Sequence, residues 1–147
     1  MEIIKFYYEY EEYGWLSNYH VCDFTLDGHN WSSTEHYYQA QKTLDPGYQE
    51  TIRLAATPDE AKQLGNSPNC HIRPDWNIHR VVAMRTAIQA KFTQNPELME
   101  LLLGTGNTEL VENSMRDYYW GCGADGSGRS MLGLLLMHLR AELRRGR

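Results

Sequence analysis

The sequence predicts an α+β fold that is mainly helical, with a small β-sheet, in a single domain covering residues 1–147. Helical periodicity with recognisable caps covers most of the chain, whereas the turn residues and composition of strands occur in only a few short stretches. No internal repeat, low-complexity tract or linker divides the 147 residues, a length sufficient to bury a core. The expected architecture is therefore a set of helices with one layer of sheet at most.

Three regions are predicted to form strands. Ile3–Tyr8 is the first, and Glu109–Glu112 is a short strand late in the chain. Between them, Cys22–Leu26 and the stretch that ends at Trp31 flank Asp27-Gly28, a dipeptide typical of tight hairpin turns. The sequence thus predicts one β-hairpin near the N-terminus.

The helices are predicted from capping residues, breakers and apolar periodicity. Ser32 with Glu35 three residues later indicates a capping box at the start of the first helix. The last helix is apolar on most sides, which predicts a central position. The predicted helices cover residues 33–43, 47–55, 58–65, 74–94, 96–104 and 130–143.

Composition narrows the range of partners. A hydrophobic content of 41% with 22% charged residues is ordinary for a soluble globular protein. The net charge of −5 argues against broad electrostatic binding to nucleic acid or to acidic membranes. No apolar stretch is long enough to span a bilayer, no signal peptide is visible, and three cysteines without a CxxC pair favour a reducing compartment. A cytoplasmic location is therefore predicted.

One face of the first predicted helix carries unusual chemistry. Glu35, Tyr38, Gln39 and Lys42 follow one another at helical spacings and so share this face. It combines an acid, a phenol, an amide and an amine, whereas a face that packs into the core would be apolar. Such a face suits a site that handles a polar, ring-shaped small molecule.

A glycine-rich loop precedes the last helix. The run from Gly121 to Gly126 matches G-x-G-x-x-G, but too little chain follows it for a dinucleotide-binding βαβ unit. The loop ends in Gly128-Arg129 just before a helix, where backbone N–H groups and a cation could bind a phosphate. The alternative is a plain connecting loop.

The remaining polar residues predict no metal and no cofactor, because no His or Cys pair has the spacing of a zinc site. Asp117 stands beside Tyr118-Tyr119-Trp120, so it is either a general acid or electrostatic group or a turn residue. Asn18 lies in a polar and aromatic loop, where it could bind the edge of a base or cap a turn.

Several motifs occur in collinear order along nearly the whole chain. They are Tyr13-Gly14-Trp15-Leu16-Ser17-Asn18-Tyr19, Asp27-Gly28-His29-Asn30-Trp31, Thr34-Glu35-His36-Tyr37-Tyr38-Gln39-Ala40-Gln41-Lys42, Ala90-Lys91-Phe92, Leu101-Leu102-Leu103-Gly104-Thr105-Gly106, Leu110-Val111-Glu112, Asp117-Tyr118-Tyr119-Trp120-Gly121, Gly126-Ser127-Gly128-Arg129, and Leu132-Gly133 with Leu135-Leu136-Met137. In these motifs the chain resembles the NADAR family, also called YbiA-like proteins.

The resemblance implies a compact, mainly helical α+β enzyme that cleaves N-glycosidic bonds. Some members resemble enzymes that hydrolyse phosphoribosylamino-pyrimidine intermediates of riboflavin synthesis, and others remove ADP-ribose from guanine bases. Nucleic acid would then be a partner only as an ADP-ribosylated substrate. This chain departs from the family at Ser130, where many relatives carry Asn, and at Cys122, where some carry an acid. Both departures bear on the choice of substrate.

The reaction suggests roles for the candidate residues. Cleavage builds positive charge on the ribose, which the carboxylates of Glu35 and Asp117 could stabilise while one of them protonates the leaving nitrogen. Alternatively, Lys42 forms a Schiff base with the opened sugar. The other candidates bind substrate: they are Trp15, Tyr38 and Trp120 for stacking, Asn18 and Gln39 for the base edge, and Arg53, Arg129, Gly121, Gly123 and Gly128 for phosphate.

The competing interpretation is a non-catalytic module that binds ADP-ribose or a nucleotide. Aromatic and phosphate-binding residues would serve it equally well. The presence of Glu35, Lys42 and Asp117 together favours an enzyme, because a binding module gains little from buried ionisable groups.

Overall fold

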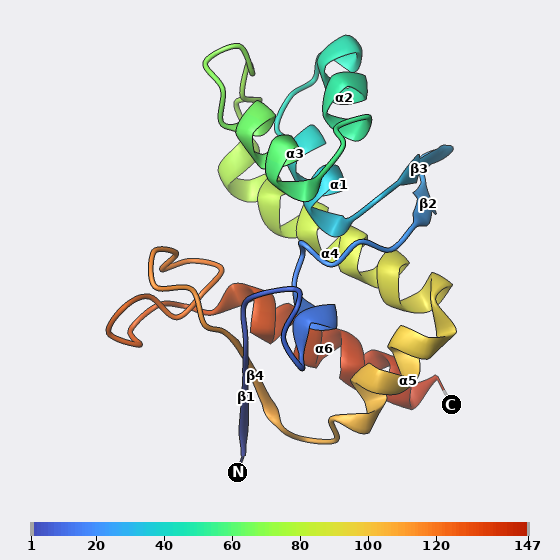
Figure 1. The fold of residues 1–147 in the computed structure, drawn as a ribbon, viewed down its shortest axis with the longest axis vertical. Helices are drawn as coiled ribbons and strands as arrows, with labels where there is room; N and C mark the ends of the chain where they lie inside the picture. The colour runs from blue at the N-terminus through green and yellow to red at the C-terminus, as the bar shows by residue number, and fades with distance from the viewer. Residues whose placement is uncertain (1, 147) are drawn as a thin grey trace. The chain divides into compact units, whose positions relative to one another are not determined.

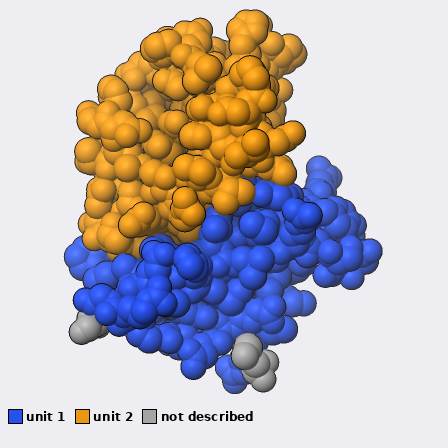
Figure 2. All heavy atoms as spheres, turned by 180° about the vertical axis from the view of Figure 1, so that it is seen from behind, with its two compact units in different colours: residues 1–17, 95–147 blue, residues 18–94 orange. Residues whose placement is uncertain are grey.

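The computed structural model describes residues 2–146, which form two compact units (Figure 2). Unit 1 combines the N-terminal segment up to Ser17 with the segment from Asn95 onward, and unit 2 is Asn18–Gln94. Helices predominate in both units and the strands are short, so the predicted mainly helical α+β class is confirmed (Figure 1).

The elements of unit 2 are a hairpin followed by four helices. They are β2 (Phe24–Leu26), β3 (His29–Trp31), α1 (Thr34–Ala40), α2 (Pro46–Arg53), α3 (Pro58–Gly65) and α4 (Trp76–Gln94). The predicted hairpin is confirmed, with Phe24 opposite Trp31 across the antiparallel pair. Asp27 and Gly28 occupy its turn with φ of 54° and 78°, values that suit these two residue types.

The elements of unit 1 are β1 (Ile3–Phe6), the short 3-10 helix η1 (Gly14–Leu16), α5 (Pro96–Gly104), β4 (Glu109–Glu112) and α6 (Met131–Arg145). β1 and β4 pair in parallel from Ile3 opposite Glu109 to Phe6 opposite Glu112. The strands of residues 2–146 thus form two separate two-stranded sheets, whereas the sequence predicted one small sheet. The reason is that β1 pairs with a strand distant in the sequence and not with the hairpin.

α1 is the central helix of unit 2. It contacts α2, α3 and α4, and all seven of its residues are buried. Ser33 caps it by accepting a hydrogen bond from His36 N at 3.2 Å. The cap is therefore Ser33 and not the predicted Ser32, which places Glu35 at the second helical position, whereas a capping box needs an acid at the third.

The buried His36 ring links α1 to Ser33 and to Ala55 by hydrogen bonds. Its Nδ1 lies 2.7 Å from Ser33 Oγ, and its Nε2 donates a hydrogen bond to the carbonyl of Ala55 at 3.0 Å. Burial lowers the pKa of His36, which favours its uncharged form. The ring thus holds α1 against the segment that follows α2.

α6 packs on β4 and α5 by one face. Leu132, Leu136 and Leu139 are buried on that face, whereas Leu134 is 49% exposed. A Cβ atom at Gly133 would overlap the carbonyl of Leu110, so glycine lets the helix backbone approach the strand closely. The predicted central position is therefore met along one face of the helix, and its other side is exposed at Leu134.

Lys91, near the end of α4, is a buried lysine with an exposed fraction of 1%. Burial lowers its pKa from 10.5 to about 8. Between these two pH values the unfolded chain binds more protons than the folded one, so the free energy of unfolding rises with pH. We expect this rise to be about 3 kcal/mol across that interval and to be absent from Lys91→Met.

Urea unfolding of both proteins at pH 8 and above measures this difference. Equal pH dependence in the two proteins would show that Lys91 does not titrate at a lowered pKa. Comparison of the two proteins cancels the groups that titrate in both of them.

No helix within residues 2–146 combines the length and the apolar character that a membrane crossing requires.

Candidate active site

The polar face of α1 forms a buried cluster of ionisable and amide groups in unit 2. Glu35, Gln39 and Lys42 are only 7%, 3% and 9% exposed. Gln39 Nε2 donates a hydrogen bond of 2.6 Å to Glu35 Oε2, so the carboxylate is held in one orientation. The structure therefore brings together the acid, the amide and the amine of the predicted face.

Lys42 lies just beyond the end of α1. The helix ends at Ala40 and not at residue 43, because the chain tightens into a turn where Lys42 N donates to Gln39 O at 3.2 Å. The carbonyl of Lys42 accepts a 2.7 Å hydrogen bond from Arg73 N. The backbone of Lys42 is thus fixed on both sides, and its Nζ donates to Asn66 Oδ1 at 2.9 Å.

The surroundings of Lys42 favour its uncharged form. Burial lowers the pKa of its amine, and Lys62 acts in the same direction. Glu35 and Cys70 oppose this shift without cancelling it. A lysine with a lowered pKa is a better nucleophile near neutral pH, because more of it carries a free electron pair.

Tyr38 forms the aromatic part of the cluster. Its ring lies 5.1 Å from the Trp76 ring at an angle of 57°, and Lys42 Nζ lies 6.0 Å from its centre. Trp76, Asn66 and Cys70 were not predicted from the sequence, because only tertiary packing brings them to this cluster. No spacing in the sequence relates them to α1.

Two residues of unit 2 that were predicted to bind substrate, Asn18 and Arg53, form hydrogen bonds within the fold. Asn18 Oδ1 accepts a 2.8 Å hydrogen bond from Thr34 Oγ1, and its carbonyl accepts one from Glu35 N at 3.2 Å. These bonds fit the alternative in which Asn18 caps a turn, and they secure the start of α1. Arg53 donates to Glu50 and, at 3.0 Å, to the carbonyl of Asn30 on the hairpin.

The glycine-rich loop of unit 1 is closed by its own backbone. The N–H groups of Gly123, Gly128 and Arg129 donate to carbonyls of Ser114, Cys122 and Tyr118, and the first amides of α6 donate to Tyr119 and Trp120. Cβ atoms at Gly121, Gly123 and Gly128 would clash with neighbouring loop atoms, so these glycines permit close packing. Among the residues predicted to bind phosphate here, Arg129 is exposed, so a ligand in solution can reach its side chain.

Ser130 begins α6 in the left-handed conformation, with φ of 48°. Asn tolerates this conformation better than most residues, which accounts physically for the Asn implied by the resemblance. The departure at Ser130 therefore concerns the backbone at the start of α6. Cys122 is partly buried, and its Sγ lies 3.5 Å from Asn113 Oδ1.

Asp117 organises the turn before this loop. Its Oδ1 accepts hydrogen bonds from Tyr119 N at 2.9 Å and from Trp120 N at 2.7 Å. Trp120 is buried, and its ring meets that of Tyr119 at an angle of 88° with 4.8 Å between their centres. The turn role of Asp117 thus uses its Oδ1.

We expect Asp117→Asn to separate the two roles of this residue. Asn keeps an Oδ1 that can hold the turn but loses the charge, so stability should change by less than about 1 kcal/mol. If the charge stabilises the transition state, kcat should fall by about 10²-fold. Thermal unfolding and steady-state kinetics measure both, and an unchanged kcat would leave Asp117 as a turn residue.

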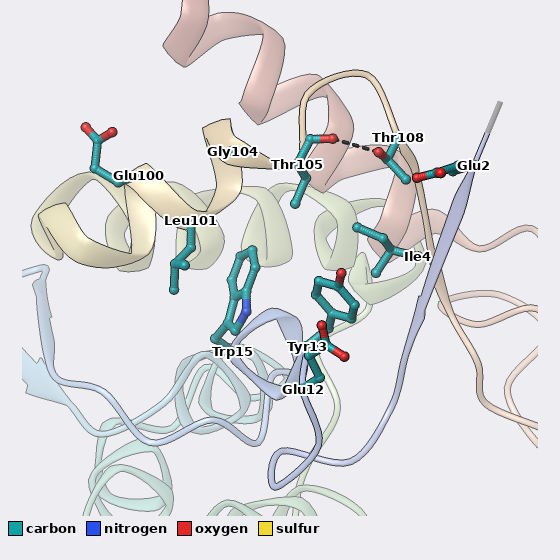
Figure 3. Close-up of a pocket in the computed structure, with 10 residues that line it drawn as sticks. All are labelled: Glu2, Ile4, Glu12, Tyr13, Trp15, Glu100, Leu101, Gly104, Thr105 and Thr108. Atoms are coloured by element: carbon teal, nitrogen blue, oxygen red, sulfur yellow. Dashed lines mark hydrogen bonds between the residues drawn. The ribbon is translucent and has the colours of Figure 1, made fainter.

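Trp15 lies in a pocket of unit 1 with a volume of about 490 Å³ (Figure 3). Tyr13 stands beside it, with 6.4 Å between the ring centres. The pocket is lined by Glu2, Ile4, Glu12, Tyr13, Trp15, Glu100, Leu101, Gly104, Thr105 and Thr108. Its three carboxylates would repel a phosphate group, so stacking of a base by Trp15 remains a prediction from the sequence.

Within residues 2–146, no three His, Cys, Asp or Glu side chains gather in a way that could hold a metal ion. We expect the activity to survive EDTA, which is checked by assaying the protein before and after chelation. Loss of activity that a single divalent cation restores would contradict this prediction and would identify the carboxylates as ligands.

Comparisons with known proteins identify the family. The NADAR domain model matches residues 5–144. The N-glycosidase YbiA of Escherichia coli (strain K12) is 43% identical over 141 residues, which cover 96% of this chain and 88% of that protein. An N-glycosidase of Nostoc punctiforme is 40% identical over 144 residues, covering 96% of this chain and 92% of that protein. The chain belongs to the NADAR family, and the predicted resemblance is confirmed.

Two further comparisons support this assignment. The NMR structure of Escherichia coli YbiA matches with a TM-score of 0.91 at 41% identity, covering 99% of this chain and 86% of that one. A riboflavin biosynthesis protein of Vibrio vulnificus is 44% identical over 140 residues, which cover 95% of this chain and 38% of that longer protein. The chain therefore shares the fold of Escherichia coli YbiA.

Proposed function

We propose that this NADAR protein is an N-glycosidase that hydrolyses the bond between a ribose C1′ and the nitrogen of a base. The observation that carries the proposal is the buried cluster of Glu35, Gln39 and Lys42 on and beside α1. Burying an acid and an amine costs free energy of folding. Ionisable groups in such surroundings are typical of catalytic sites, where their chemistry offsets that cost. Relatives named N-glycosidase support the same reaction.

The proposed substrates are the phosphoribosylamino-pyrimidine intermediates of riboflavin synthesis. The Vibrio vulnificus relative named as a riboflavin biosynthesis protein supports this choice. In these compounds the sugar carbon bears an exocyclic amine, so the ring can open to an imine at C1′. The resulting electrophilic carbon suits attack by a lysine with a lowered pKa.

In the proposed mechanism, the uncharged amine of Lys42 adds to C1′ of the opened sugar. The aminopyrimidine then leaves with a proton, and Glu35 is placed by Gln39 to supply it. Water adds to the remaining lysine imine and releases ribose 5-phosphate, which restores the free amine. The alternative keeps the ribose ring closed, with carboxylates stabilising an oxocarbenium ion.

The other predicted roles remain proposals. Tyr38 would stack on the base, because its ring borders the Glu35–Lys42 cluster. Substrate-binding roles for Trp15, Trp120 and Arg129, and a catalytic role for Asp117, still rest on the sequence. We further propose that residues 1–147 act as one NADAR domain in the cytoplasm, where the free thiols of Cys22, Cys70 and Cys122 would stay reduced.

The test compares two substrates side by side. The protein is incubated with a phosphoribosylamino-pyrimidine and with ADP-ribosylated guanine, and the released base is quantified by liquid chromatography. Faster release from the pyrimidine supports the proposal, and faster release from guanine would reassign the chain to the removal of ADP-ribose. Binding without release from either compound would contradict catalysis and leave a binding module.

A further inference from the structure

The C-terminal end of α3 contacts the cluster at two consecutive residues. We propose that Gly65 and Asn66 are positioning residues for the reaction: Asn66 holds the amine of Lys42, and Gly65 leaves the space in which Gln39 holds the carboxylate of Glu35. This inference rests on the proposed function, because it assigns both residues to the chemistry of Glu35 and Lys42.

The bond between Lys42 and Asn66 joins two anchored residues. Lys42 Nζ donates to Asn66 Oδ1 at 2.9 Å. Asn66 is the C-cap of α3, and its own N–H donates to the carbonyl of Lys62 at 3.0 Å. Because the backbone of Lys42 is also fixed by Gln39 and Arg73, the bond sets the direction of a side chain that would otherwise be flexible.

The neutrality of the Asn66 amide matters as much as its position. The charged or titratable groups that act on Lys42 are Glu35 on α1, Lys62 on α3 and Cys70 after it. A carboxylate at position 66 would add a second negative charge beside the amine and favour its protonated form. An amide accepts the hydrogen bond without that effect, so it orients the amine and leaves it nucleophilic.

Gly65 is required for space and not for its backbone conformation. It is the last residue of α3 and is buried. A Cβ atom there would overlap Gln39 Oε1 and lie 2.9 Å from Gln39 Cδ. Gln39 is itself buried and donates to Glu35, so its amide cannot swing away from a larger residue without releasing that carboxylate.

The first experiment measures Lys42 without substrate. The chain has four lysines, so a protein labelled with ¹³C-lysine gives few Cε signals, and the signal absent from Lys42→Arg is that of Lys42. We expect Asn66→Asp to raise the pKa of Lys42 by about 1 unit, as a nearby opposite charge does. The acidic limb of kcat should move to higher pH by the same amount, with activity recovered in alkaline buffer.

Asn66→Ala provides the contrast in this experiment. It removes the acceptor without adding charge, so kcat should fall at every pH and alkaline buffer should not restore it. Asn66 is exposed, so both variants are expected to fold. Identical Lys42 titration and kcat in the wild type and both variants would overturn the proposal for Asn66.

The second experiment is a double-mutant cycle between Gly65 and Gln39. We expect Gly65→Ala to lower kcat about tenfold, and the same change to have no further effect in Gln39→Ala, where the space is already open. Gly47→Ala is the control, because a Cβ there meets only an ordinary contact of 3.5 Å with Asp45. An equal loss in both backgrounds would overturn the proposal for Gly65. The Asn66 variants decide the proposal if Gly65→Ala does not fold.

These readouts separate the inference from the proposed function. If the wild type releases no base but Asn66→Asp still shifts the titration of Lys42, the function is contradicted and the geometry stands. If the wild type releases base and neither the titration of Lys42 nor kcat changes in the Asn66 variants, the function stands and the positioning role of Asn66 is contradicted.

Discussion

Glu35→Gln is expected to abolish turnover and leave the fold intact. The substitution removes the proton and the charge of the carboxyl group, and such groups contribute about 10²- to 10⁴-fold to catalysis. Gln can still accept the hydrogen bond from Gln39 through its own carbonyl oxygen. Because Gln has nearly the same shape as Glu and keeps this hydrogen bond, stability should change by less than about 1 kcal/mol. Steady-state kinetics and thermal unfolding of the same preparation measure both effects.

Glu97→Gln is the matched control for this change. Glu97 occupies the first turn of α5 as Glu35 does in α1, and it is exposed. Its replacement therefore removes a similar charge near a helix start and should leave kcat unchanged. A kcat near the wild-type value in Glu35→Gln would show that Glu35 serves only to orient Gln39.

The chemistry of α1 was predictable because it is local. Glu35, Tyr38, Gln39 and Lys42 share a face through helical spacing alone, and the structure places them in one cluster. The exact start of the helix was harder to predict. Two serines stand side by side, and the choice of Ser33 depends on its contact with the His36 ring, which a capping rule does not include.

Features that depend on distant packing could not be predicted. The pairing of β1 with β4 joins strands that are far apart in the sequence, and no local sequence pattern predicts it. Asn66 looked like an ordinary residue after a helix, and only the packing of α3 on α1 brings it to Lys42. The loop glycines matched a phosphate-binding pattern in sequence, but the N–H groups of Gly123, Gly126 and Gly128 donate to backbone carbonyls of Ser114, Gly123 and Cys122.

Lys42→Arg is expected to lower kcat by about 10³-fold or more and to prevent covalent trapping. If an imine forms, borohydride added during turnover by the wild type should leave a reduced sugar adduct that mass spectrometry locates on Lys42. Arg keeps the positive charge but stays protonated, so it cannot act as a nucleophilic amine. Lys5→Arg, an exposed substitution on β1, is the control and should keep both activity and the adduct.

The outcomes of this experiment distinguish three roles for Lys42. Its amine is buried beside Asn66 and Tyr38, and burial lowers its pKa, so direct attack on the sugar is the expected role. Absence of an adduct with substantial activity in Lys42→Arg would favour carboxylates that stabilise an oxocarbenium ion. A change in KM with kcat preserved would instead show that Lys42 binds the substrate, because uniform binding affects KM alone. An adduct on Lys42, together with the loss of kcat in Lys42→Arg, is the result expected for the amine as nucleophile.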